Sequence, residues 1–320
     1  MPGFTFHDLL ATQAGILDEV IAGLALAQKQ IPPKYFYDAR GCELFEAVCG
    51  LPEYYPTRTE LAIMRLHAPA MAARLGPDCA LIEIGCGNSE KTRLLLEALC
   101  PEIFVPIDIA REQLESSCGV LALSFPGMKI AALRADFGKP VALPVAGLER
   151  ARRRVLYFPG STIGNFTPAE ARAFLAWWAP LLGAGGGALI GVDLKKDPAL
   201  LDAAYNDAQG VTAAFNLNLL TRFNRELGAD FDLSGFRHRA FYLPGRGRIE
   251  MHLESVRGQR VTVNGKSFEF RARETIHTEN SYKYSVAEFQ ELAQAAGFEP
   301  VQCWTDGGNL FSVHYLTLPS

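Results

Sequence analysis

Residues 81–92 of the chain, LIEIGCGNSEKT, decide the fold. An apolar run ends at Ile84, a Gly-x-Gly turn follows at Gly85 and Gly87, and a helical pattern then begins. Two glycines let the backbone turn sharply and approach a ligand closely, while the first amides of the following helix face that ligand. The segment therefore predicts a strand, a turn that binds a nucleotide-type cofactor, and a helix.

The residues around this turn distinguish between possible cofactors. A dinucleotide fingerprint has a third glycine where Glu90 stands, and a phosphate-binding P-loop has Gly-Lys-Ser/Thr after four spacers. An acid in the strand before a two-glycine turn, here Glu83, instead resembles the first motif of class I methyltransferases, which use S-adenosylmethionine (SAM). SAM has no pyrophosphate, so neither phosphate-binding pattern is needed.

Acidic residues also follow the next two apolar runs. The run 104–108 (FVPID) ends in Asp108, and the run 129–134 (KIAALR) leads to Asp136 and Phe137. The carboxyl ends of neighbouring parallel strands meet at the ligand crevice, and an acid on the second strand can accept both ribose hydroxyls. We therefore predict that Asp108 binds the ribose, and that Asp136 and Phe137 hold the adenine.

The remaining pattern alternates strands with helices. Strands are expected near 80–85, 103–108, 129–134, 154–158 and 187–193, with helices near 60–75, 90–99, 111–123 and 168–181. A helix over 286–296 then precedes two strands, 299–304 and 311–318, joined by a turn with two glycines. This order predicts an α/β protein with a Rossmann-like, seven-stranded sheet, parallel except for a C-terminal antiparallel hairpin.

The segments outside this pattern are expected to form a second domain. Residues 8–29 have helical periodicity, and short β-like runs occur at 248–254 and 259–263. Prolines on either side of residues 53–55 favour an extended loop there. We therefore expect a SAM-binding domain of residues 61–194 and 284–320, and an α+β substrate-binding domain of residues 1–60 and 195–283.

Composition limits the partners. The chain has 320 residues, a formal net charge of −4 and a single basic cluster at 152–154. We therefore expect no nucleic-acid partner, and we expect a small acidic or zwitterionic substrate. No signal-peptide pattern opens the sequence and no apolar run approaches the ~18 residues that span a bilayer, so we expect a cytoplasmic protein without a membrane partner. The seven cysteines lack C-x-x-C spacing and the six histidines lack metal-ligand spacing, so we expect free thiols and no metal.

Four longer motifs together resemble one family. They are PKYFYDARGCELFEAVCGLPEYYPTRTE (33–60), EIGCGNSEKT (83–92), FPGSTIGNF (158–166) and HTENSYKYS (277–285). They are similar to those of the histidine Nα-methyltransferases of ergothioneine biosynthesis, and the resemblance extends over roughly residues 30–316. One departure is Asn280, where an apolar residue is usual in the family.

The resemblance implies two sets of site residues. Those expected to bind SAM are Tyr37, Gly85, Gly87, Lys91, Asp108, Asp136 and Phe137. Those expected to bind histidine are Tyr54, Asn165, Tyr205, Met251, Glu279 and Ser281. Tyr37, Tyr54 and Asn165 are expected to act in catalysis.

These residue types suit an amino-acid substrate. The Asn165 amide and the Tyr205 hydroxyl can hold a carboxylate without adding net charge. Glu279 can accept an imidazole N–H, and Ser281 can bond the other ring nitrogen. The ring faces of Tyr37, Phe45 and Tyr54 can stabilise a quaternary ammonium product, by roughly 0.5–2 kcal/mol for each well-placed ring.

The resemblance therefore implies an enzyme that trimethylates the α-amino group of L-histidine to hercynine, with SAM as cosubstrate, no metal, and a monomeric state. One alternative keeps the chemistry with another amino acid, such as a tryptophan derivative, because Glu279 can also accept an indole N–H. Another is a SAM-binding protein without turnover, although such a protein would not need a second, amino-acid-binding set of residues.

Overall fold

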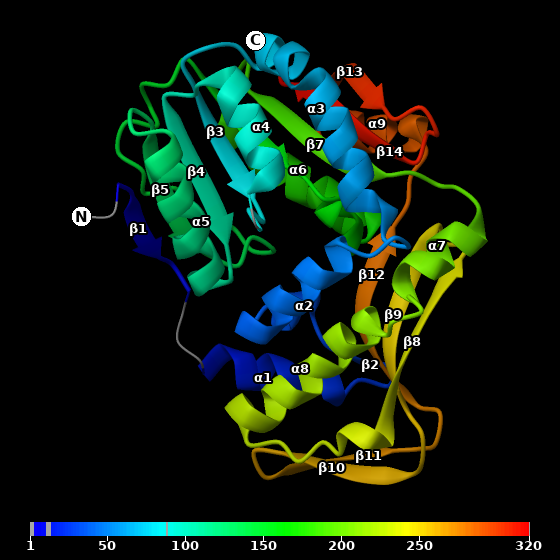
Figure 1. Ribbon diagram of the computed structural model, residues 1–320. Coiled ribbons are helices and arrows are strands. Elements are labelled where there is room, and N and C mark those ends of the chain that lie inside the picture. The colour runs from blue at the N-terminus through cyan, green and yellow to red at the C-terminus, as the bar shows by residue number, and fades with distance from the viewer. Residues whose placement is uncertain (1–2, 11–13, 88, 320) are drawn as a thin grey trace. The chain divides into compact units, whose positions relative to one another are not determined.

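The computed structural model describes residues 3–10, 14–87 and 89–319, which fold into two compact units (Figure 1). Unit 1 comprises residues 1–10, 56–195 and 282–320, and unit 2 comprises residues 11–55 and 196–281. Among the helices of the described residues, none combines the length and apolarity needed to cross a bilayer.

Unit 1 is built on a mainly parallel sheet, which in the described part of the chain has eight strands in the order β1-β5-β4-β3-β6-β7-β14-β13. The strands are β1 (Thr5–Asp8), β3 (Cys79–Ile84), β4 (Ile103–Asp108), β5 (Lys129–Arg134), β6 (Arg153–Phe158), β7 (Gly187–Asp193), β13 (Glu299–Thr305) and β14 (Phe311–Thr317). Neighbours from β1 to β7 are parallel, whereas β14 is antiparallel to both β7 and β13. The Rossmann-like sheet with a C-terminal antiparallel hairpin is therefore confirmed.

Helices cover both faces of this sheet. Figure 1 shows α3 (Tyr55–Leu75), α4 (Glu90–Leu99) and α5 (Arg111–Ser124) on one face, and α6 (Pro168–Leu182) and α9 (Val286–Ala295) on the other. The apolar residues of the central strands divide between these two layers. In β3, Leu81 packs in the cluster with α3, α4 and α5, while Ile82 packs in the cluster with α6 and α9. Parallel strands buried on both faces have the continuous apolar sequence that made them predictable.

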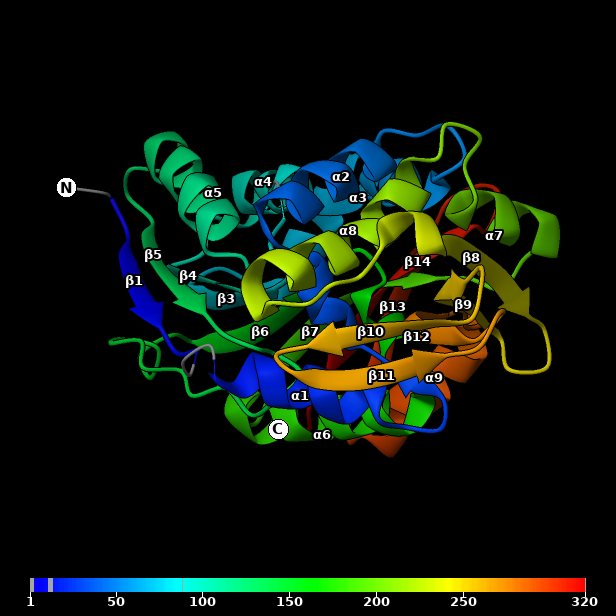
Figure 2. The same ribbon diagram turned by 90° about the horizontal axis from the view of Figure 1, so that it is seen from below.

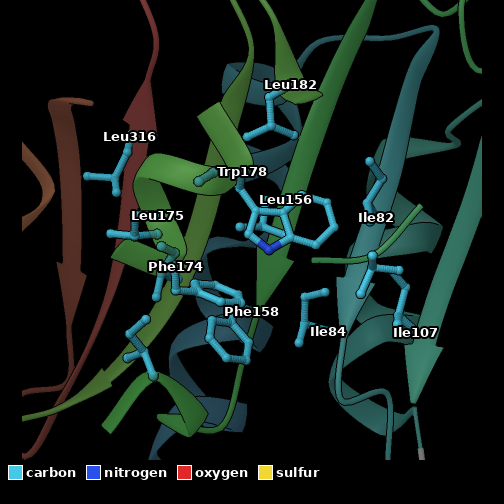
Figure 3. Packing of buried hydrophobic residues seen from close by; sticks show 14 of the residues in the cluster. Ile82, Ile84, Ile107, Leu156, Phe158, Phe174, Leu175, Trp178, Leu182 and Leu316 are labelled. Atoms are coloured by element: carbon cyan, nitrogen blue, oxygen red, sulfur yellow. The ribbon is translucent and has the colours of Figure 1, made fainter. Parts of the chain in front are cut away.

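The α6 side of the core is densely aromatic. Figure 3 shows Phe158 of β6 facing Phe174 and Trp178 of α6. The ring centroids of Phe158 and Phe174 lie 5.0 Å apart. Burying each such side chain stabilises the fold by roughly 1.5–3 kcal/mol. This packing fixes the carboxyl end of β6, from which Asn165 follows.

The N-terminal segment differs from the expectation in three ways. β1 adds an eighth strand, four partly exposed residues at the sheet edge that have no apolar alternation to predict them. Among the described residues of the expected helix 8–29, α1 covers Ala14–Leu24. The chain returns so closely past Gly23 that a Cβ there would lie 2.1 Å from the Gln30 carbonyl oxygen. Finally, α3 begins at Tyr55, several residues before the expected start near residue 60. Pro56 is compatible with this start, because a proline in the first helical turn loses no hydrogen bond.

Unit 2 is α+β. Its helices are α1, α2 (Ala39–Cys49), α7 (Pro198–Tyr205), α8 (Val211–Leu227) and the short turns η1 (Pro33–Phe36) and η3 (Leu233–Gly235). Its strands are β2 (Lys29–Gln30), β8 (Phe236–Leu243), β9 (Arg248–Ser255), β10 (Gln259–Val263), β11 (Lys266–Phe270) and β12 (Thr275–Tyr282), which ends in unit 1. They form a sheet in the order β2-β12-β9-β8 and the β10–β11 hairpin, which Figure 2 shows.

Buried Asn216 fastens α8 to this sheet. Its Oδ1 accepts a hydrogen bond of 2.9 Å from Thr278 Oγ1 on β12, and its Nδ2 donates one of 3.0 Å to the His252 carbonyl on β9. Because Asn216 is fully buried, each lost bond would leave an unpaired polar group in the interior. The strands that carry Met251 and Glu279 are thus held by one side chain.

Candidate active-site residues

The glycine turn of unit 1 follows β3 directly. Gly85 has φ +70° and Gly87 has φ +48°, and a Cβ at either position would meet no atom within 4 Å. Among the described residues, glycine is therefore favoured at both positions by the positive φ and not by crowding. The Gly87 carbonyl accepts a hydrogen bond of 2.7 Å from Ser117 of α5, which holds the turn in place.

Glu83, two residues before the turn, is fully buried. Thr92 Oγ1 donates a hydrogen bond of 2.5 Å to Glu83 Oε1, whereas the Oε2 atom has no partner within the described residues. Burial raises the pKa of Glu83 to about 8, so the carboxyl is largely protonated at neutral pH. Glu83 is thus a buried, largely neutral acid, two residues before the glycine turn, with one oxygen that lacks a partner among the described residues.

Asp108 ends β4, the strand beside β3. The Ala110 amide donates a hydrogen bond of 3.0 Å to Asp108 Oδ1, and Cys86 Sγ donates one of 3.8 Å to Oδ2. Burial raises the pKa of Asp108, while the backbone amides of Ala110, Ile109 and Gly87 oppose that rise. The carboxylate lies next to the glycine turn, as the sequence predicts for a ribose ligand.

The next strand brings the predicted adenine residues to the same edge of the sheet. Asp136 and Phe137 follow β5, and the Gly138 amide donates a hydrogen bond of 3.0 Å to Asp136 Oδ1. The half-buried Phe137 ring makes an edge contact with Phe158, with centroids 6.0 Å apart. The glycine turn, Asp108 and this pair therefore follow three neighbouring parallel strands.

Lys91 lies in the first turn of α4 and has a partner that the sequence analysis missed. Its Nζ is 2.6 Å from Oε2 of Glu60, a residue of α3 whose side chain is 1% exposed. The carboxylate of Glu60 also accepts hydrogen bonds from the Gly160 amide, at 2.9 and 3.1 Å. A buried acid thus joins the cofactor helix to the turn after β6.

Asn165 ends a short helical turn, η2 (Thr162–Asn165), after β6. A Cβ on Gly164 would lie 2.7 Å from the Tyr282 carbonyl oxygen, so only glycine fits this close approach. The N-cap of α6 is Thr167, in a capping box with Glu170, so Asn165 has no capping role there. Its half-buried amide has no hydrogen-bond partner within the described residues and is available to a ligand.

An aromatic cluster dominates the predicted residues of unit 2. Tyr37, Phe45, Tyr54 and Tyr205 follow one another with ring centroids 5.7, 6.3 and 6.2 Å apart, all in edge arrangements. Phe215 of α8 contacts both Tyr37 and Phe45, at 6.0 and 5.6 Å, and was not predicted. Ring faces of this kind bind quaternary ammonium groups.

Polar groups adjoin this cluster. The Tyr205 hydroxyl donates a hydrogen bond of 2.8 Å to Ser281 Oγ, and both side chains are buried. Burial raises the pKa of Tyr54 well above its usual value, and nearby Tyr205, Cys49 and Glu279 raise it further. Tyr54 is therefore a neutral phenol near a carboxylate.

The two remaining residues predicted to bind the substrate, Met251 and Glu279, lie in strands of the unit 2 sheet. Met251 is buried in β9, and its carbonyl accepts a hydrogen bond of 3.1 Å from Thr278 Oγ1. Glu279 is half-buried in β12, and its carbonyl hydrogen-bonds His277 Nε2 at 3.0 Å. The main chain around Glu279 is thus held by a histidine that the sequence analysis did not single out.

One group of metal-ligand types lies together within the described residues, namely Glu250, His252 and His277. Its geometry does not suit a shared ion. The two imidazoles are stacked, with centroids 4.7 Å apart and planes 17° apart, so their in-plane lone pairs cannot meet at one point. The Glu250 carboxylate is already bonded to Arg248 and to His252 Nε2. We interpret the group as a hydrogen-bonded stack.

A doubly wound sheet with a glycine turn after one strand and acidic residues at the ends of the next two is typical of class I SAM-dependent methyltransferases. A Thermobifida fusca protein assigned to the methyltransferases has a similar solved structure, with a TM-score of 0.50 at 12% identity, covering 93% of this chain and 98% of that one. The model of one family, described as histidine-specific methyltransferase, SAM-dependent, matches residues 16–318. The chain belongs to this family, and SAM is its cosubstrate.

Curated relatives agree with the family match. The chain is 43% identical over 302 residues to the histidine N-alpha-methyltransferase of Mycolicibacterium smegmatis, covering 92% of each sequence. It is 40% identical over 301 residues to the protein of the same name from Mycobacterium tuberculosis, again covering 92% of each. The similarity therefore includes both compact units.

Proposed function

We propose that the chain transfers three methyl groups in succession from SAM to the α-amino group of L-histidine, forming hercynine for ergothioneine biosynthesis. The observation that carries this proposal is a group in unit 2: the Tyr54 ring contacts the Tyr205 ring, the Tyr205 hydroxyl donates a hydrogen bond to Ser281, and the charge of Glu279 raises the pKa of Tyr54. Aromatic rings, hydroxyls and one carboxylate match an ammonium, a carboxylate and an imidazole N–H.

Most of the residues assigned to SAM belong to unit 1, and most of those assigned to the amino acid belong to unit 2. The residues assigned to SAM are Tyr37 of unit 2 together with Gly85, Gly87, Lys91, Asp108, Asp136 and Phe137. The positive φ of the two turn glycines and the Asp108 carboxylate beside the turn support this assignment. SAM supplies an electrophilic methyl group on a sulfonium sulfur.

Histidine is assigned to Tyr54, Asn165, Tyr205, Met251, Glu279 and Ser281. Asn165 and Tyr205 would hold the carboxylate, and Glu279 with Ser281 would hold the imidazole, with Met251 as a wall. In the structure the Tyr205 hydroxyl donates to Ser281. On binding, this hydroxyl turns to the substrate carboxylate, and Ser281 then bonds the ring nitrogen.

Each transfer starts from a neutral amine, whose lone pair forms the N–C bond while the C–S bond of SAM breaks. The ammonium of histidine therefore loses one proton before the first transfer, and the nitrogen loses one more proton after each of the first two transfers. The protein mainly aligns nucleophile, carbon and sulfur. Tyr54 stays a phenol because its pKa is raised, so its role is to donate a hydrogen bond and offer a ring face. Tyr37 and Asn165 complete the proposed catalytic set.

A panel of amino acids tests the proposal. Purified chain and SAM are incubated separately with histidine, tryptophan and phenylalanine, and products are measured by mass spectrometry. Histidine should gain up to three methyl groups, and an Asp108→Ala variant serves as the cofactor-site control. Reaction with tryptophan but not with histidine would replace the proposed substrate with an indole amino acid.

A further inference from the structure

Glu60 joins two segments of unit 1 that the SAM assignment needs. It lies in the second turn of α3, and its carboxylate contacts Lys91 Nζ at 2.6 Å and the Gly160 amide at 2.9 and 3.1 Å. Lys91 is in the first turn of the helix after the glycine turn, and Gly160, with φ +76°, starts the turn that leads to Asn165. One buried side chain therefore sets the position of both segments.

The sheet is shaped to accept this carboxylate. A Cβ on Gly191, in the middle of β7, would lie 2.2 Å from Glu60 Oε1. Glycine inside a strand weakens it and marks a place where another group approaches the backbone closely. An alanine at this position would displace Glu60. The strand therefore has a glycine at the place where the carboxylate lies.

The charges of Glu60 and Lys91 also affect how Lys91 is oriented. A carboxylate that is 1% exposed is unfavourable unless charges and hydrogen bonds compensate it, and here Lys91 and the Gly160 amide do so. The Lys91 ammonium has three donors, of which the contact with Glu60 engages one. The others remain directed by that contact, and the SAM carboxylate is a fitting acceptor for a fixed ammonium.

We propose that Glu60 is a positioning residue for SAM, acting through Lys91 and the Gly160 turn. The inference rests on the proposed function, in which Lys91 belongs to the SAM site. Glu60 does not touch the reacting atoms; it fixes the direction of the Lys91 ammonium toward the carboxylate of SAM.

The test compares Glu60→Gln with Glu60→Asp and with a matched control, Glu97→Gln, which removes an exposed acid of α4 that pairs with Arg93. SAM affinity is measured by calorimetry in the absence of histidine, and KM for each substrate by kinetics. Glu60→Gln should weaken SAM binding by about tenfold or more, because a charge-assisted contact is lost. Glu60→Asp should recover part of the affinity, and the control and the KM for histidine should change less than about twofold.

Decarboxylated SAM separates positioning from a merely structural role. If Glu60 acts through Lys91, the preference of the wild type for SAM over decarboxylated SAM should shrink in Glu60→Gln. A general loosening of the site would weaken both ligands equally and would overturn the proposal. Tighter SAM binding by Glu60→Gln would also overturn it, since Glu60 would then compete with SAM for Lys91.

A double variant covers the case in which Glu60→Gln folds poorly. Lys91→Met with Glu60→Gln removes both partners and leaves no unpaired buried charge. It should bind SAM as weakly as Lys91→Met alone, and a further additive loss would contradict the inference. A wild type that binds SAM but does not methylate histidine would reject the proposed substrate without affecting this test, whereas one that does not bind SAM would reject both.

Discussion

The Tyr205 hydroxyl lies 2.8 Å from Ser281 Oγ and donates a hydrogen bond to it, although the two residues were expected at opposite ends of the substrate. Tyr205 ends α7, Ser281 lies in β12, and both side chains are buried. The residue assigned to the substrate carboxylate and the residue assigned to its ring are therefore hydrogen-bonded to each other, so that a change at either residue should affect the other.

Tyr205→Phe tests this coupling. The change removes the hydroxyl but keeps the ring beside Tyr54. The fall in kcat/KM for histidine should correspond to a loss of about 1–3 kcal/mol in transition-state stabilisation, while SAM affinity is retained. Ser281→Ala should have a smaller effect in the Tyr205→Phe background than in the wild type, with a coupling of roughly 0.5–3 kcal/mol. Strictly additive kinetics of the four proteins would show that the two ends act independently.

Asp108→Ala should weaken SAM binding. It removes the acceptor assigned to the ribose hydroxyls, and hydrogen bonds to a charged group contribute about 1.5–3 kcal/mol. Glu115→Ala, which removes an exposed acid of α5, is the control. Calorimetric titration should give wild-type affinity for the control only; wild-type affinity for Asp108→Ala would reject Asp108 as the ribose ligand.

Lys283→Met should destabilise the fold strongly. Lys283 Nζ lies 2.6 Å from Asp193 Oδ2, with side chains 1% and 0% exposed. Removing one partner leaves an uncompensated buried charge, at a cost of about 3–5 kcal/mol in the free energy of unfolding. Lys195→Met breaks the exposed pair with Glu288 and should cost less than about 1 kcal/mol. Equal denaturant midpoints for the two variants would refute the distinction.

The raised pKa of Glu83 predicts a pH-dependent affinity for SAM. The carboxyl holds its proton up to about pH 8, and a bound sulfonium cation nearby would lower that pKa. The complex then holds fewer protons than the free protein, so SAM affinity should rise with pH and level off above about pH 8. Asp108, whose pKa is also raised, should act in the same direction.

Calorimetry in buffers of different ionisation enthalpy measures this proton release directly. In Glu83→Gln the release should be smaller. Proton uptake on SAM binding, or a release that Glu83→Gln leaves unchanged, would contradict the assignment of Glu83 to the cofactor's surroundings.

The sheet of unit 1 could be predicted because its strands are buried on both faces. Runs such as 80–85 and 187–193 are mainly apolar segments, and the structure has β3 and β7 within one residue of them. β1 could not be predicted, since Thr5–Asp8 is short, polar and partly exposed, and its pairing with β5 joins residues more than a hundred positions apart.

Some residues of the candidate site could likewise be predicted from the sequence, and others could not. Asp108 ends β4, Asp136 comes two residues after β5, and Asn165 follows β6 after a short helical turn, so strand prediction brings them to one edge of the sheet. Glu60 and Phe215 lie within helices, and their contacts with Lys91 and with Tyr37 appear only in the folded structure. For Glu60 a signal existed, because Gly191 interrupts an apolar strand at the place where the carboxylate lies.

The central claim is that the methyl groups go to the α-nitrogen of histidine. Tandem mass spectrometry of the product formed from SAM and histidine labelled with nitrogen-15 at the α-amino group tests it most directly. We expect a trimethylated product that loses trimethylamine carrying the label, with an unmodified imidazole. A methyl group retained on the imidazole fragment, or no product from histidine at all, would contradict it.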